Sequence, residues 1–381
     1  MRRLLAAAIL AATTLVTTGL TACSAPEPPR AAASSAAPAG PVTLPAPTGG
    51  RPVGSTVLHL TDASRPDPWD ESMRARELRV TLWYPAEKRG GPPAPYMSPE
   101  EAELLLAGSG LAVTRAETLS GTRTHSVRDA GPAGRGLPLV VLSPGFTKPA
   151  STLTSLAEDL ASRGYAVAAI DHTHESHATT LADGRVAGCL ACDFSDDPGF
   201  RAGLVQGRAA DVSFVLDRLA ATYPGLIDLG RTGMAGQSIG GAAAVAAMVA
   251  DPRVRAGIDL DGTTHARVPA RGLSRPFLFL GTPEHVPGGP DHSWDRDWKA
   301  LTGWRRWLVV AGAEHQTFTD IPLLADAIGL DPLPGMLPAA RGAELTRAYV
   351  AAFFDLHLRG RRQPLLDGPS PRHPEVTFGP Q

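Results

Sequence analysis

Cysteine, net charge and long apolar runs are all scarce in this sequence, and each shortage excludes a class of protein. Three cysteines are too few for a four-cysteine zinc site. Lysine and arginine total 36 against 38 acidic residues, and this balance of −2 does not suggest nucleic acid as a partner. The N-terminal apolar run, residues 4–16, is too short to cross a membrane. The remaining composition, 43% hydrophobic and 19% charged in 381 residues, predicts a globular protein of one or at most two domains.

The N-terminus has the pattern of an export signal. Two arginines precede the apolar run, and Leu20-Thr21-Ala22-Cys23 follows it, which is the order of a secretory signal before its cleavage point. These four residues resemble the lipobox of bacterial lipoproteins. We therefore expect a signal peptide over residues 1–22 and Cys23 as the lipidated first residue of the mature chain. The alternative is an ordinary secretory signal with an incidental cysteine.

Residues 23–50 consist largely of proline, alanine, serine and threonine. Such a segment buries too little apolar surface to offset its ordering entropy, so it predicts a linker. The linker would hold a folded domain, residues 51–381, away from the outward face of a bacterial cell membrane. In the polar loop farther on, Cys189 and Cys192 are spaced C-x-x-C. In an exported protein this spacing favours a local disulfide over a redox motif, which would need a thioredoxin-like strand and helix around it.

Strand-like segments alternate with helical ones, a pattern typical of an α/β fold with a mostly parallel sheet covered on both faces. The first expected strand alternates and stops at Pro85, so we expect it to be antiparallel. The expected strands are residues 78–84, 137–142, 165–170, 231–235, 254–260, 276–280 and 307–310, and the expected helices are 150–163, 200–222, 242–250 and 343–358. The Pro-rich stretch 90–99 and the loop 171–198 are expected to cross the strand ends, where such folds place substrate contacts.

Gly236-Gln237-Ser238-Ile239-Gly240 fits the G-x-S-x-G nucleophile elbow, and the strand and helix that this motif requires flank it. A serine hydroxyl is a weak nucleophile, and a strained strand-to-helix turn exposes it for attack. A Gly-rich turn that only resembles the elbow is the alternative. The tetrahedral intermediate also needs two backbone N–H donors. We expect these from Ile239, directly after the nucleophile, and from Phe146 in the loop after strand 137–142.

The serine needs a histidine base and an orienting carboxylate, which in this fold follow it in the order Ser, Asp or Glu, His, each just past a strand. Among the later histidines only His315 directly follows a strand and a small turn. Asp259 and Asp261 are both candidates for the carboxylate. We favour Asp261, because it leaves the strand into a glycine turn and successive strand side chains face opposite sides.

Together these segments resemble the platelet-activating factor acetylhydrolase family of α/β-hydrolases, plasma type, over roughly residues 55–360. The resemblance implies an α/β-hydrolase fold, a triad of Ser238, Asp261 and His315, and calcium-independent ester hydrolysis without a cofactor. Its most specific part is the match to the family's G-x-x-H-Q-x-F pattern. The matching segments are Ser143-Pro144-Gly145-Phe146, Tyr165 to His172, the elbow, Ala256 to Asp261, and Gly312-Ala313-Glu314-His315-Gln316-Thr317-Phe318.

The sequence departs from the family at Gln237, where histidine is common, and in its S-P-G-F loop, which bacterial cutinase-like polyester hydrolases share. We therefore expect a serine esterase acting on short or oxidised acyl chains of phospholipids or similar small esters. A lipase or cutinase-like polyesterase is the alternative within enzymes. A lipoprotein that binds lipid on a catalytically dead scaffold is the alternative outside them, although a binder has no need of all three triad residues.

Residues 171–177 contain three histidines and two acids, which are enough ligands for a metal ion. Their spacing is irregular, however, and the serine mechanism needs no metal. We expect this loop to lie near the pocket without a metal, and His172 to order it through a hydrogen bond.

Overall fold

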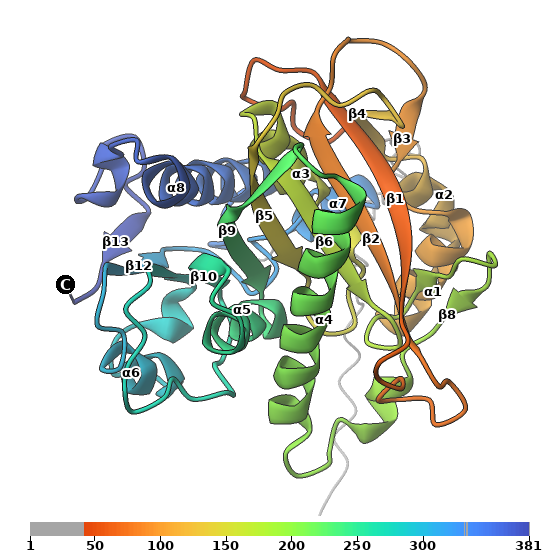
Figure 1. The fold of residues 1–381 in the computed structure, drawn as a ribbon. Helices are drawn as coiled ribbons and strands as arrows, with labels where there is room; N and C mark the ends of the chain where they lie inside the picture. The colour runs from red at the N-terminus through yellow and green to blue at the C-terminus, as the bar shows by residue number, and fades with distance from the viewer. Residues whose placement is uncertain (1–41, 331, 333, 381) are drawn as a thin grey trace, which may run out of the picture. The chain divides into compact units, whose positions relative to one another are not determined.

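A large, mostly parallel sheet with helices on both faces forms the centre of the molecule (Figure 1). The computed structural model describes residues 42–330, 332 and 334–380, so Cys23 and the expected signal peptide lie outside the described residues. In the described part of the chain, no helix is both long and apolar enough to cross a membrane.

Thirteen strands belong to two sheets. The large sheet contains β1 (Val53–Asp62), β2 (Arg76–Pro85), β3 (Pro93–Pro95), β4 (Arg123–Arg128), β5 (Leu137–Ser143), β6 (Ala166–His172), β9 (Ile227–Gln237), β10 (Val254–Leu260), β11 (Phe277–Gly281), β12 (Arg305–Val310) and β13 (Val376–Phe378), and the small one contains β7 (Thr179–Thr180) and β8 (Val186–Ala187).

The helices follow in chain order. The α-helices are α1 (Pro99–Gly108), α2 (Ala116–Ser120), α3 (Thr154–Ser162), α4 (Phe200–Thr222), α5 (Ile239–Ala250), α6 (Ser293–Trp298), α7 (Ile321–Ala327) and α8 (Ala339–Arg359). Short 3-10 helices are η1 (Val113–Arg115), η2 (Ala150–Leu153), η3 (Leu190–Phe194), η4 (Pro283–His285) and η5 (Pro364–Leu366).

The order of the large sheet is β13-β12-β11-β10-β9-β5-β6-β2-β1-β4-β3, and its six strands from β12 to β6 are parallel. β2 pairs antiparallel with β1 and β6, as its alternating sequence predicts. β5 is buried along its whole length and sends alternate side chains to two cores. Leu139 and Val141 pack with α4 and α5 on one face, whereas Val140 and Leu142 pack with α3 and α8 on the other. The predicted α/β fold with two covered faces is therefore confirmed.

Two sequence expectations need correction. The helix expected from residue 150 begins as the 3-10 turn η2 and becomes α-helical only at Thr154. The stretch 90–99 does not simply cross the strand ends, because Pro93–Pro95 forms β3 at the outer edge of the sheet and pairs with β4. Proline lacks an N–H and is tolerated in a sheet at such an edge.

The folded domain begins earlier than residue 51. Leu44 is 1% exposed and packs in an apolar cluster with α1, α2 and α7. Thr48 donates from both its N–H and its hydroxyl to Asp159 Oδ1, at 2.8 and 2.6 Å. Arg347 donates to the carbonyls of Pro45 and Ala46. The linker prediction is wrong for residues 42–50. Amino-acid composition reflects only the average tendency of a segment to be buried, whereas one buried leucine and several hydrogen bonds attach this segment to the domain.

Candidate active site

Ser238 stands alone between β9 and α5, in a backbone conformation that L-residues rarely adopt (φ 57°, ψ −123°). Glycines make this turn possible. A Cβ on Gly236 would lie 2.2 Å from the carbonyl carbon of Gly240, and one on Gly240 would lie 2.0 Å from the carbonyl oxygen of Ser143. Ser238 itself is half-buried, so its hydroxyl is within reach of a substrate. The turn has the geometry of a nucleophile elbow.

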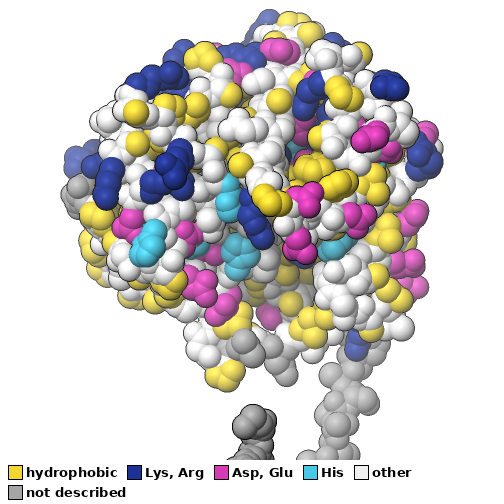
Figure 2. Space-filling model, turned by 90° about the horizontal axis from the view of Figure 1, so that it is seen from below, with side chains coloured by type: hydrophobic (Ala, Val, Ile, Leu, Met, Phe, Trp, Pro, Cys, Tyr) yellow, Lys and Arg dark blue, Asp and Glu magenta, His cyan; other side chains and the backbone are white. Residues whose placement is uncertain are grey.

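The parallel sheet brings the expected base and carboxylate to the same edge as Ser238. Ser238 follows β9, Asp261 follows the neighbouring β10, and His315 follows β12 two strands farther on. His315 Nδ1 lies 2.7 Å from Asp261 Oδ2. Figure 2 shows this face from below, with histidine side chains gathered near its middle among acidic and hydrophobic ones.

The charge state of Asp261 decides which nitrogen of His315 is free. Burial alone would raise the pKa of Asp261, but hydrogen bonds from His285, His315 and the Thr282 N–H hold it well below its usual range. An ionised carboxylate only accepts, so Nδ1 of His315 carries a proton, and in the neutral ring the lone pair is then on Nε2. That is the tautomer a general base for serine needs.

Asp259 is not the partner of His315. It is fully buried, and its Oδ1 accepts from the Gly262 N–H at 2.8 Å. Burial, together with the nearby Asp261 and Asp291, raises its pKa well above the usual range despite the Gly262 hydrogen bond. Asp259 therefore lies beneath the turn that carries Asp261, in surroundings that favour its neutral form.

Of the two expected oxyanion donors, Ile239 directly follows Ser238, and Phe146 directly follows Gly145, where a Cβ would lie 3.5 Å from Ser238 Cβ. Among the hydrogen bonds of the described residues, none engages the N–H of Phe146 or of Ile239. Gln237 was singled out in the sequence only as a departure from the family. Its Nε2 donates to the carbonyl of His315 at 2.8 Å, so it ties the elbow to the histidine loop.

A buried Ser-His-Asp hydrogen-bond chain begins at Ser143, the first residue of the expected oxyanion loop, Ser143-Pro144-Gly145-Phe146. Ser143 Oγ is 3.0 Å from His172 Nε2, and His172 Nδ1 is 2.7 Å from Asp211 Oδ2. All three side chains are buried, at no more than 2% exposure, so no ester can reach this serine. Arg208 donates to Ser143 Oγ and, at 2.5 Å, to the carbonyl of Pro144. This network supports the loop that carries the Phe146 N–H.

From the sequence we expected His172 to form a hydrogen bond, but we did not identify Arg208 as a member of the same network or Asp211 as the partner of His172. A signal for them existed. They lie four and seven residues after Leu204, on the core-facing stripe of the predicted helix 200–222, where charged side chains are rare unless paired. They are paired here, Asp211 with Arg76 and Arg208 with Glu175.

The loop considered for a metal uses its side chains in other ways. Among the described residues, no group of three His, Cys, Asp or Glu side chains is arranged to hold a metal ion. Asp171 binds Arg79 at 2.9 Å, Glu175 binds Arg208 at 2.7 Å, and His174 Nδ1 lies 3.2 Å from Asp67. Both acids and two of the three histidines of this loop, His172 and His174, are thus engaged by neighbouring elements.

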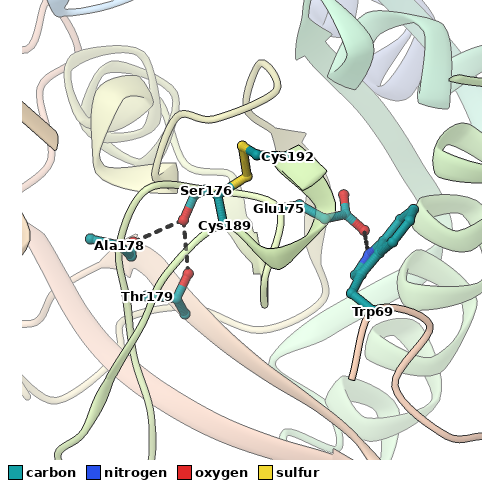
Figure 3. Close-up of a disulfide and its surroundings, with 7 residues drawn as sticks. All are labelled: Trp69, Glu175, Ser176, Ala178, Thr179, Cys189 and Cys192. Atoms are coloured by element: carbon teal, nitrogen blue, oxygen red, sulfur yellow. Dashed lines mark hydrogen bonds between the residues drawn. A yellow bond between two sulfur atoms is a disulfide. The ribbon is translucent and has the colours of Figure 1, made fainter. Parts of the chain in front are cut away.

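The disulfide loop lies beside this network. Cys189 and Cys192 form a disulfide, and the N–H of Ala191 donates to the carbonyl of His174. Figure 3 shows Trp69 reaching across to Glu175, with its Nε1 3.0 Å from the carboxylate. The Trp69 ring packs against Phe200, which in turn packs against the ring of Phe146. Aromatic side chains thus extend from the oxyanion loop toward the disulfide.

An apolar cavity of about 220 Å³ adjoins the site. It lies among α1, α2 and α7, and its wall includes Lys148, two residues after Phe146, and Gln316, next to His315. Leucines and isoleucines form most of the remaining wall, together with Ser109 and Ala325: Leu105, Leu106, Leu111, Leu119, Ile321, Leu324, Ile328 and Leu330.

Comparison with known proteins places the chain in a family. A family model described as platelet-activating factor acetylhydrolase, isoform II, matches residues 43–186, which include the oxyanion loop. A curated protein of Arthroderma benhamiae, named probable 1-alkyl-2-acetylglycerophosphocholine esterase, is 32% identical over 368 residues, covering 88% of this chain and 93% of the relative. The chain belongs to the platelet-activating factor acetylhydrolase family.

A solved structure gives the same fold and a different substrate. The ferulic acid esterase from Streptomyces cinnamoneus is 48% identical, covers 88% of this chain and 99% of its own, and superposes with a TM-score of 0.80. The fold is therefore that of an α/β-hydrolase. This member of the family is a carboxylesterase of the serine-hydrolase class.

Proposed function

We propose that the chain hydrolyses carboxylic esters with Ser238 as nucleophile, His315 as general base and Asp261 as the residue that orients His315. The observation that carries this proposal is the 2.7 Å hydrogen bond from His315 Nδ1 to Asp261 Oδ2 beside a strained, half-exposed serine. Ser238 Oγ attacks the ester carbonyl while its proton passes to His315 Nε2. The N–H groups of Ile239 and Phe146 bind the oxyanion.

The alcohol then leaves with the proton from His315, and water hydrolyses the acyl-enzyme by the same steps in reverse order. A fluorophosphonate probe tests the assignment. We expect it to label wild-type protein at Ser238 and to label the Ser143→Ala variant equally, but not Ser238→Ala. Absence of label from folded wild-type protein would support the lipid-binding alternative instead.

For the substrate, we propose a small acyl group, such as the acetyl ester of a glycerophosphocholine named for the fungal relative. The apolar cavity beside Lys148 and Gln316 supports this, since its 220 Å³ is below the roughly 300–1,000 Å³ of typical drug-sized ligand sites. An oxidised or short chain fits such a volume better than a long saturated one.

A hydroxycinnamate ester is the second candidate. It is favoured by the 48% identity to a ferulic acid esterase and by the aromatic side chains of Phe146, Phe200 and Trp69 beside the oxyanion loop. Three sets of hydrolysis rates distinguish these candidate substrates: rates on p-nitrophenyl esters from acetate to palmitate, on acetylated glycerophosphocholine and on methyl ferulate. A decline beyond short chains favours the first candidate, dominant turnover of methyl ferulate the second, and high rates on palmitate or polyester films the lipase or polyesterase alternative.

We further propose that the enzyme works outside the cell, held at the membrane by a lipid on Cys23. The lipobox-like residues 20–23 support this location, and the disulfide agrees with an oxidising compartment.

A further inference from the structure

Asp261 holds a second histidine in addition to His315. Its Oδ2 accepts from His315, whereas its Oδ1 lies 2.9 Å from His285 Nδ1 and 2.7 Å from the N–H of Thr282. His285 ends η4 and is only 6% exposed. Its ring stacks on Trp294, with 4.3 Å between the ring centroids. The sequence placed His285 in a loop and assigned it no role, yet the fold packs it directly against the carboxylate of the triad.

Both ring nitrogens of His285 meet a carboxylate. Nε2 lies 3.1 Å from Asp291 Oδ2. Asp291 is itself held by the Ser293 N–H at 2.7 Å and by the Thr263 hydroxyl at 2.5 Å. A neutral imidazole donates from one nitrogen only and would turn the lone pair of the other toward a carboxylate oxygen. Hydrogen bonds to two ionised carboxylates therefore require the doubly protonated imidazolium.

The charges around His285 agree with this geometry. Burial alone would lower its pKa, but Asp261 and Asp291 raise it above the usual range. Burial likewise opposes ionisation of Asp291, and its hydrogen bonds hold its pKa below the usual range. The titratable and charged groups that face this cluster are Asp259 from β10, Asp261 from the turn after β10, Asp291 from the loop before α6, Arg296 from α6, and His265 and His315 from loops.

Resting on the triad proposed above, we propose that His285 is a positioning residue of that triad. As an imidazolium it fixes the Asp261 carboxylate and offsets part of its charge. A fully charged, unpaired carboxylate would hold a proton on His315 more strongly. With His285 in place, His315 remains free to accept the proton of Ser238 at lower pH than an unassisted triad would allow.

The variant His285→Asn tests this directly, because the asparagine amide can still donate toward Asp261 but carries no charge. We expect the acidic limb of the kcat/KM profile to move to higher pH by roughly half a unit to one unit, as expected when a buried neighbouring charge is removed. We expect kcat on the pH plateau to change by a smaller factor than kcat/KM changes at the pH of the acidic limb. His292→Asn is the matched control. It makes the same change a few residues away, on a side chain that is 77% exposed and 3.8 Å from Asp295, and it should leave the limb in place.

An unchanged limb in His285→Asn, or a limb displaced to lower pH, would overturn the proposal. Nitrogen-15 NMR of the wild-type protein gives a second test that needs no variant to fold. We expect the signals of both His285 ring nitrogens to be those of an imidazolium at pH 7, and signals of a neutral ring would overturn the proposal equally. Failure of the proposed function is a separate result, since it appears as full activity of Ser238→Ala and leaves the NMR signal of His285 unaffected.

Discussion

At the scale of single residues, the buried Ser-His-Asp chain shows that residue type does not by itself make a nucleophile. Ser143 belongs to this hydrogen-bonded chain but is fully buried and accepts from Arg208, whereas Ser238, the proposed nucleophile, is half-exposed on a strained turn. Exposure and backbone geometry decide between them. The hidden chain contributes support instead of chemistry.

We therefore expect Ser238→Ala and His315→Ala each to lower kcat by roughly four to six orders of magnitude, because triad members act as a unit. Melting temperatures should change little, since neither side chain is buried. Ser143→Ala should retain most of the activity. Steady-state kinetics on p-nitrophenyl acetate, with thermal melts as the control for folding, measures both. Loss of activity in Ser143→Ala equal to that in Ser238→Ala would contradict the assignment.

Asp259, within β10, and Asp261, directly after it, should differ in the same assay. Asp261→Asn should lower kcat by about four orders of magnitude, because the amide disturbs the tautomer of His315. Asp259→Asn should lower kcat only mildly, because the surroundings of Asp259 favour its neutral form and its carboxyl accepts from Gly262 instead of His315. The reverse ranking would transfer the orienting role to Asp259.

Asp259 should also shape the dependence of stability on pH. Its folded-state pKa lies well above its unfolded value of about 3.9, so the stability it contributes is complete below that value and is lost as pH rises toward the folded pKa. Asn has no proton to lose. The melting temperature of Asp259→Asn relative to wild type should therefore be higher at pH 7.5 than at pH 4. An equal difference at both pH values would show that Asp259 is ionised in the folded state.

At the scale of elements, α4 acts on the site from behind through Arg208. This side chain donates to the Pro144 carbonyl and to Ser143 Oγ and pairs with Glu175, whose own carbonyl accepts from the Thr147 N–H. The oxyanion loop is thus held at two points by elements distant in sequence. Loss of either contact should loosen the Phe146 N–H, which we propose to bind the oxyanion of the transition state.

Arg208→Met should therefore lower kcat by roughly one to three orders of magnitude, with a smaller change in KM, because an oxyanion donor contributes mainly in the transition state. Arg218→Met on the exposed side of α4 is the control and should leave kcat unchanged. Affinity for a boronic acid that mimics the tetrahedral intermediate should fall in parallel with kcat. If KM rises while kcat is unchanged, Arg208 affects substrate binding and not the oxyanion loop.

At the scale of the whole molecule, activity should survive prolonged EDTA treatment. Both acids of residues 171–177, together with His172 and His174, contact Arg79, Arg76, Arg208, Asp67 and the buried Ser143, and the proposed chemistry needs no Lewis acid. Loss of activity on chelation that returns with added calcium or zinc would contradict this expectation.

Anchoring should be separable from catalysis. We expect Cys23→Ser to release the protein from the membrane fraction with its esterase activity intact, because Cys23 lies well before the folded domain that carries the site. Detergent phase partitioning of wild-type and variant protein measures it. Partition of wild-type protein entirely into the aqueous phase would contradict lipidation.

The sequence by itself determined the α/β fold, the buried strands and the elbow at Ser238, because these features are local. Apolar runs, helical periodicity and glycines around a serine each report on a few consecutive residues. It also ranked His315 and Asp261 first, because a fixed strand order turns position along the chain into position in space. It failed at residues 42–50 and at β3, where attachment depends on partners far along the chain.

Only the tertiary structure decided which charged side chains meet. From the sequence we assigned no role to Arg208, Asp211 or His285. Their roles arise when α4 packs behind the oxyanion loop and η4 packs behind Asp261. The neighbouring sequence does not indicate the hydrogen-bond partners of these residues. Hydrogen bonds between buried groups depend on distances and angles, and only the packing of the whole chain determines these. The elbow at Ser238 could be predicted from the sequence, but the contacts that support it could be found only in the tertiary structure.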